Sequence, residues 1–190
     1  MKIIELAEDE VLTESMLSRK GALPASVIAS AAAIVEEVRE KKDAALRAFE
    51  SKFDHVDIAD FRVPQQVIDA SLDEVGEEFL ASCKKAEAQI RDFHQREVQQ
   101  SWFTTRPDGT ILGQKVTPLD SVGIYVPGGR AQYPSTVLMN AVPAKVAGVE
   151  RIVMVTPPQA DGKLSPYTLC AAKIAGVDEI YTVGGAQAIA

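Results

Sequence analysis

The sequence is poor in the residues that most often bind metals or form cross-links. Its 190 residues include two cysteines and two histidines. Cys83 and Cys170 are far apart in the chain, which is typical of reduced, buried thiols rather than of a CxxC motif. His55 and His94 together with these cysteines do not have the sequence spacing of metal ligands. The spacing therefore predicts no metal-binding residue in the chain, and no protease, hydrolase or Walker motif is present.

The sequence also lacks a long uncharged apolar run and an excess of basic residues. A membrane-spanning helix needs about 18 consecutive apolar residues, and no such run occurs. The acidic residues near the start of the chain are the opposite of a secretory signal. The net charge of -7 disfavours a nucleic-acid partner. We therefore expect a cytoplasmic protein with neither a membrane nor a nucleic-acid partner.

The first half of the chain has helical periodicity. Apolar residues recur at steps of three and four from Pro24 to Phe49 and again from Ile68 to Phe93. The spacing of Ser71 and Glu74 matches a capping box, so we expect a short helix to break there. A helix of about six turns is then predicted over 77–98. Residues 1–100 are accordingly predicted to form a helical segment that serves packing and assembly.

Residues 101–120 change character. The stretches 102–105 and 110–116 are rich in aromatic and β-branched residues, which favours strands. Between them, 106–109 has the Pro-Asp-Gly composition of a turn. This segment is therefore predicted to be a β-hairpin.

From residue 121 onward the pattern becomes α/β. Short apolar strands are predicted at 122–126, 151–155 and 179–183, with helices at 134–147 and 165–175 between them. This βαβαβ order implies a parallel sheet. After the third strand, 184–190 resembles a loop that opens another helix. Because a three-stranded parallel sheet is rarely complete, we expect this domain to be truncated at Ala190.

Two glycine pairs follow strands of the predicted sheet. Gly128-Gly129 comes after the first strand and Gly184-Gly185 after the third. Ligands of α/β sheets bind outside the carboxyl ends of strands, where helix N-termini favour anions. Tyr125 and Gln187 are the candidate ligand-contacting side chains beside these pairs. The GxGxxG fingerprint is absent, so ordinary tight turns, a half-buried strand aromatic and a self-capping amide stay open as alternatives.

The ordered motifs of the chain closely resemble the histidinol dehydrogenase family. The residues that carry the resemblance are 53–54, 93–94, 122–129, 135–139, 141–149, 156–158 and 183–190. The resemblance implies a fold similar to aldehyde dehydrogenases, with an incomplete Rossmann-like βαβαβ parallel sheet starting at residue 121. It also implies an intertwined homodimer that oxidises L-histidinol to L-histidine in two NAD-dependent steps of histidine biosynthesis.

The same resemblance assigns roles to two residues. Tyr125 and Gln187 match the family's NAD-contacting tyrosine and glutamine. The family's third NAD contact, its zinc ligands and its acid/base pair fall in the later part of the family's chain. We therefore expect no catalytic and no zinc-binding residue within 1–190, and no activity from this N-terminal fragment alone. The alternative is a stand-alone nucleotide-binding or oligomerisation module.

Overall fold

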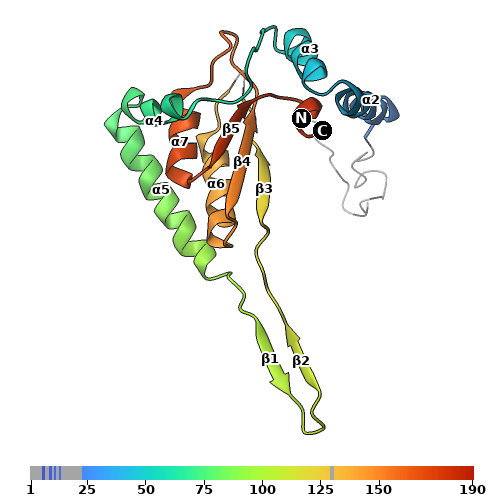
Figure 1. Cartoon of the computed structure of the whole chain (residues 1–190), viewed down its shortest axis with the longest axis vertical. Helices are drawn as coiled ribbons and strands as arrows, with labels where there is room; N and C mark the ends of the chain where they lie inside the picture. The colour runs from blue at the N-terminus through green and yellow to red at the C-terminus, as the bar shows by residue number, and fades with distance from the viewer. Residues whose placement is uncertain (1–5, 7–8, 10, 12, 14–22, 129–130) are drawn as a thin grey trace.

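The computed structural model describes residues 6, 9, 11, 13, 23–128 and 131–190. Among these residues, four helices come first, followed by a hairpin and then by alternating strands and helices (Figure 1). Their bounds are α2 Ala25–Lys41, α3 Asp43–Phe53, α4 Gln65–Glu74, α5 Glu77–Gln95, β1 Trp102–Thr105, β2 Ile111–Gln114, β3 Ser121–Tyr125, α6 Pro134–Val146, β4 Arg151–Thr156, α7 Pro166–Ala175, β5 Glu179–Thr182 and the 3₁₀ helix η1 Ala186–Ala188. Within the described residues, no helix is long and apolar enough to cross a membrane.

The strands form two separate sheets. β1 and β2 pair antiparallel, with Trp102 opposite Gln114 and Thr105 opposite Ile111. β3, β4 and β5 form a parallel sheet in that spatial order. The predicted hairpin and the predicted parallel α/β unit are both confirmed. The parallel unit follows from its sequence, because short apolar strands alternate with helices that begin at Pro134 and Pro166 and end near Gly148 and Gly176.

A stretch of chain between α3 and α4 covers the outer edge of β5. Val63 N donates to Ile180 O at 2.9 Å, and Thr182 N donates to Phe61 O at 2.7 Å. These bonds flank an isolated antiparallel bridge between Arg62 and Tyr181. The order across the sheet is therefore 61–63, β5, β4, β3.

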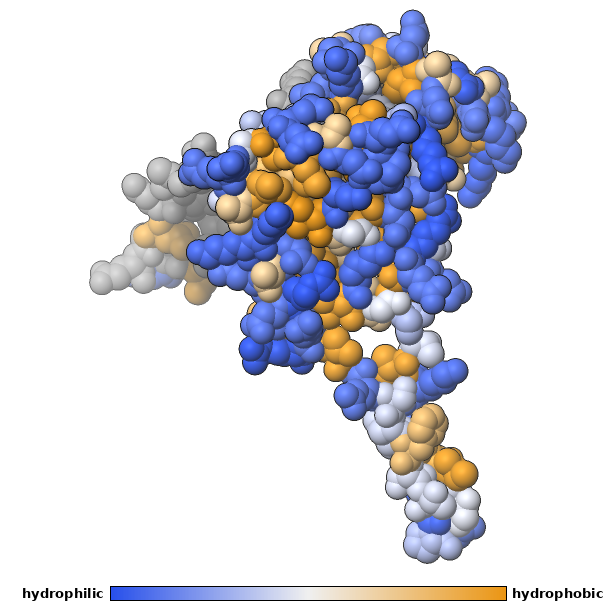
Figure 2. Space-filling model, turned by 60° about the vertical axis from the view of Figure 1, so that its left-hand side comes forward, coloured by the Kyte–Doolittle hydropathy of each residue, from blue (hydrophilic) through white to orange (hydrophobic). Residues whose placement is uncertain are grey.

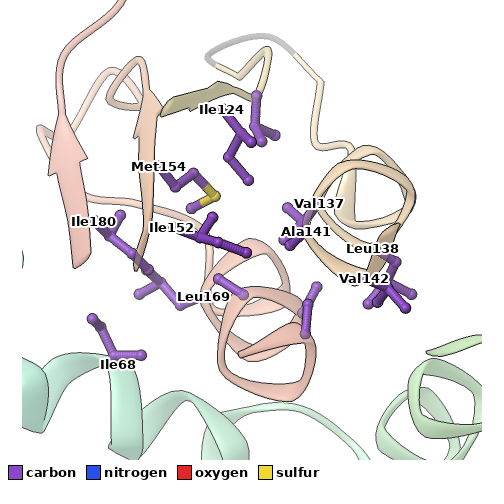
Figure 3. Packing of buried hydrophobic residues seen from close by; sticks show 14 of the residues in the cluster. Ile68, Ile124, Val137, Leu138, Ala141, Val142, Ile152, Met154, Leu169 and Ile180 are labelled. Carbon is purple, nitrogen blue, oxygen red and sulfur yellow. The ribbon is translucent and has the colours of Figure 1, made fainter. Parts of the chain in front are cut away.

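The main hydrophobic core lies between the parallel sheet and one layer of helices. Figure 3 shows Met154 and Ile152 of β4 directed toward Val137 of α6 and Leu169 of α7, all of them buried. α4 packs on α7, and α5 packs on α6 and α7, so Ile68 of α4 joins the same cluster. α4, α5 and the βαβαβ unit therefore share one core, whereas α2 and α3 form a separate small apolar cluster.

Three helix boundaries differ from the prediction, since α5 ends at Gln95 and not at residue 98 and two breaks fall elsewhere. The first periodic stretch is interrupted at Lys42, whose φ of 52° is left-handed and separates α2 from α3. Ser71 lies inside α4 and donates to Ile68 O at 2.6 Å, so the predicted capping box is wrong. The break falls instead at the extended residues Val75 and Gly76, and α5 begins with Glu77. A hydroxyl bonded to the preceding turn of its own helix is not available to cap the next one.

Met154 is the test residue for this core. It is fully buried at the centre of the sheet, so Met154→Ala should lower the free energy of unfolding by about 2–5 kcal/mol. Val67→Ala, on the exposed side of α4, is the control and should change it by less than about 0.5 kcal/mol. Urea denaturation followed by circular dichroism measures both. Equal losses for the two variants would contradict the placement of the core.

Candidate functional site

The carboxyl ends of β3, β4 and β5 lie together at one end of the parallel sheet, which we call the carboxyl edge. This end of the sheet faces α3 and η1 (Figure 1). The loops that follow the three strands are in close contact there. A Cβ on Gly128 would lie 3.0 Å from Pro157 O, and a Cβ on Gly184 would lie 2.5 Å from Pro157 Cβ. The sequence therefore needs glycine at Gly184 for the loops after β4 and β5 to pack together. Gly129 lies outside the described residues.

The chain after β5 turns sharply at Gly185. Its φ of 62° and ψ of -165° belong to a region that is essentially confined to glycine. η1 follows, with Ala188 N donating to Gly184 O at 3.2 Å. The sequence predicted the start of a further helix here. The structure instead has a single 3₁₀ turn, which we call the strand-end turn, Gly184–Ala188.

Tyr125 connects the first and third loops. It is the last residue of β3, and its hydroxyl accepts a hydrogen bond from Gly185 N at 3.1 Å. Parallel strands end on the same side of a sheet, so β3 and β5 bring these residues together across β4. The structure thus places Tyr125 beside the strand-end turn, at the edge where the sequence located a ligand site.

Gln187 faces inward rather than into an open cleft. Its side chain is 3% exposed, and its Nε2 donates to Glu50 Oε1 at 3.0 Å. Gly184 N donates to the same oxygen at 3.1 Å. Glu50 comes from α3 and is fully buried. The three residues form a polar cluster beneath the strand-end turn.

Sequence reasoning missed Glu50. Its partners are more than 130 residues away in the chain, so no local motif could reveal the contact. The available signal is weak: Glu50 lies four residues after Leu46, on the side of α3 that carries Ala45 and Phe49 in a small apolar cluster with α2. A carboxylate next to an apolar stripe of a helix is unusual, because burial of a charge is costly.

Burial raises the pKa of the Glu50 carboxyl above its ordinary value. The hydrogen bonds from Gln187 and from Gly184 oppose this rise, since both stabilise the ionised form. The nearby Asp54 carboxyl adds to it, through its negative charge and as a neighbouring acceptor. The net result is a Glu50 pKa above the ordinary value of a glutamate side chain.

A separate cleft is present elsewhere in the molecule. It has a volume of about 490 Å³ and lies at the amino ends of the strands, between α5, α6 and the base of the hairpin. Its lining includes His94, Pro118 and Val149. Among the described residues, no group of three or more His, Cys, Asp and Glu side chains is placed to hold a metal ion. We therefore retain the carboxyl edge, where the glycine loops converge, as the candidate site.

The fold and this edge together define an α/β protein with a Rossmann-like βαβαβ parallel sheet and glycine-containing loops at its carboxyl end. Residues 17–190 match the family model of histidinol dehydrogenase. The chain belongs to the histidinol dehydrogenase family.

Individual relatives agree with this assignment. The chain is 46% identical over 189 residues to a histidinol dehydrogenase of Methanosarcina mazei, covering 99% of this chain and 43% of that protein. It is 53% identical over 157 residues to one of Bacillus licheniformis, covering 83% of this chain and 37% of that one. It resembles the crystal structure of histidinol dehydrogenase from Elizabethkingia anophelis with a TM-score of 0.85 at 31% identity, over 93% of this chain and 41% of that one. The chain thus spans less than half the length of these relatives.

Gly184 provides a direct test of the packing at this edge. Gly184→Ala should lower the free energy of unfolding by about 1–3 kcal/mol, because the added methyl overlaps Pro157. Gly123→Ala is the matched control in β3, where a Cβ meets nothing within 4 Å. Thermal unfolding compares the two. If Gly184→Ala were as stable as Gly123→Ala, the contact between the loops after β4 and β5 would be disproved.

Proposed function

We propose that residues 1–190 form the cofactor-side, N-terminal portion of an NAD-dependent histidinol dehydrogenase that oxidises L-histidinol to L-histidine. The observation that carries the proposal is the hydrogen bond between Tyr125 and Gly185, which joins two strand-end loops at one edge of the sheet. Family membership supplies the reaction and the substrate class.

The residues at this edge are suited to a dinucleotide. Glycine loops allow the main chain to approach phosphates closely, and a tyrosine ring offers a flat surface with a polar end. In this proposal Tyr125 contacts NAD and orients it against the sheet edge. Gln187 fits less directly, because its amide is turned toward Glu50. In this proposal its contribution is to hold the strand-end turn through its hydrogen bond to Glu50.

NAD, when bound, accepts hydride from the alcohol carbon. The residues described here bind and orient the cofactor in this proposal, and they include no assigned proton acceptor for the alcohol. Zinc belongs to the family's chemistry, but the described residues bring no ligand set together. No step of the reaction is therefore assigned to zinc here.

The test uses a fusion of residues 1–190 with the part of the Methanosarcina mazei relative that this chain does not cover. The fusion should reduce NAD when histidinol is added, whereas the 190-residue chain alone should not. Tyr125→Phe in the fusion should raise KM for NAD about two- to tenfold, as expected for the loss of a hydrogen bond worth about 0.5–1.5 kcal/mol. KM for histidinol should stay unchanged.

The matched control is Tyr167→Phe. Tyr167 is a half-exposed tyrosine whose ring makes a T-shaped contact with Phe79, away from the carboxyl edge of the sheet. It should leave both constants unchanged. A folded fusion without histidinol-dependent turnover would contradict the proposed function. Turnover that is insensitive to Tyr125→Phe and Tyr125→Ala would contradict the assignment of Tyr125 alone.

We also propose that the protein is a homodimer whose interface includes the hairpin. The hairpin stands clear of the rest of the molecule, with apolar side chains on its surface (Figure 2). All residues of β1 and β2 are exposed. The pairing places Trp102 and Leu112 on one face and Phe103 and Ile111 on the other. An isolated two-stranded hairpin is marginally stable in water, so apolar residues on both faces favour burial against a second copy.

Light scattering tests this interface. The wild-type chain should show a mass of twice 20.5 kDa, and the double substitution Phe103→Glu with Ile111→Glu should weaken the dimer about tenfold or more, as expected for buried apolar anchors. Val67→Glu adds a charge at an exposed apolar position of α4 and should leave the mass unchanged. A monomeric wild-type chain at all accessible concentrations would rule out the hairpin interface.

A further inference from the structure

Glu50 is an ionisable residue in a fully buried position. Its carboxyl lies between α3 and the strand-end turn, where the exposed fraction of the residue is 0%. Its two hydrogen-bond donors, Gly184 N and the Gln187 amide, are uncharged. In the part of the chain that the structure describes, no basic side chain forms an ion pair with it. An ionised carboxylate in such a position is strongly disfavoured.

The cluster around Glu50 has more acceptors than donors. Both donors reach Glu50 Oε1, while Glu50 Oε2 and Gln187 Oε1 are buried and have no hydrogen-bond partner. Turning the Gln187 amide over would place its carbonyl oxygen against Glu50 Oε1 and would not supply a donor. A proton on Glu50 does supply one, because a neutral carboxylic acid carries an O–H.

We infer that Glu50 is a positioning residue that holds the strand-end turn Gly184–Ala188 in place as a neutral carboxylic acid. Glu50 Oε1 accepts the hydrogen bonds from Gly184 N and from the Gln187 amide. The proton on Glu50 Oε2 adds the hydrogen-bond donor that the cluster lacks. Gly185, which bonds to Tyr125, is thereby fixed from both sides. The significance of this turn for a cofactor rests on the proposed function, whereas the protonation and the contacts of Glu50 do not.

The surroundings of Glu50 agree with a neutral acid. Burial is the main cause that raises its pKa, and Asp54, at the end of α3, raises it further. Both α2 and η1 pack against α3; η1 contributes the uncharged Gln187, and Asp54 is the charged side chain that acts on the Glu50 pKa. The pKa of Glu50 is higher in the folded chain than in the unfolded chain. Its full contribution to the free energy of unfolding is therefore present at pH values below the unfolded pKa. That contribution is lost as the pH rises through the folded pKa.

The first experiment is a carbon-detected NMR titration of the side-chain carboxyls in the 190-residue chain. The Glu50 resonance should change at a higher pH in the folded chain than in the same chain unfolded by urea. Asp54→Asn should move the Glu50 titration to lower pH, since it removes the neighbouring negative charge. A Glu50 resonance that changes at the same pH in the folded and the unfolded chain, or at a lower pH in the folded chain, would overturn the inference.

The second experiment compares variants. Glu50→Gln retains an acceptor for Gly184 N and gains an amide donor, so it imitates the neutral acid. It should leave the amide resonances of Gly184 and Gly185 in place and the melting temperature within about 2 °C of the wild-type value, whereas Glu50→Ala should lower that temperature by about 5 °C or more. Glu40→Gln removes the same charge at an exposed position of α2 and is the control.

The variants also separate the two proposals. As pH rises, the wild-type chain should lose stability relative to Glu50→Gln, since the variant has no proton to lose. If Glu50→Gln is as damaging as Glu50→Ala, an ionised carboxylate is required and the inference is wrong. Should Glu50→Ala fail to fold, the titration and Glu50→Gln still decide. None of these measurements involves NAD, so loss of the cofactor assignment for Tyr125 would leave them unaffected.

Discussion

The packing of α6 and α7 against one face of β3, β4 and β5 is the constraint on which the rest of the structure depends. The buried side chains of β4 alternate with half-buried ones, so one face of the sheet carries the core. α4 and α5 then cover the outer side of these two helices. With this layer in place, the three strands end at one edge and their loops must meet there.

Much of this arrangement was predictable from the sequence because it depends on local patterns. Short apolar strands, prolines at helix starts and glycines at helix ends predicted the βαβαβ unit, and the turn composition of 106–109 predicted the hairpin. The break at Lys42 was not predictable. Its positive φ is stabilised by the packing of α2 on α3, since lysine itself does not favour that backbone conformation. The assumed cap at Ser71 failed because its hydroxyl had a nearer acceptor within α4.

Some residues of the candidate site were likewise predictable from the sequence, and others were not. Gly184 and Gly185 follow an apolar strand and Tyr125 ends another, so their position at the carboxyl edge could be inferred from chain order. The inward orientation of Gln187 could not, since it depends on a carboxyl from α3. Glu50 shows why a sequence pattern alone is incomplete: its partners are defined by the tertiary fold, and a single buried acid in a helix has no recurring spacing.

The stretch 61–63 has a consequence for how this sheet can be enlarged. It pairs with the outer edge of β5, so a further strand cannot pair directly with β5, whereas the edge of β3 is open to one. The chain progresses from β3 through β4 to β5, and a strand added beside β3 would reverse that direction. In doubly wound sheets the ligand crevice opens at such a topological switch point. The crevice would then fall at the carboxyl end of β3, next to Tyr125.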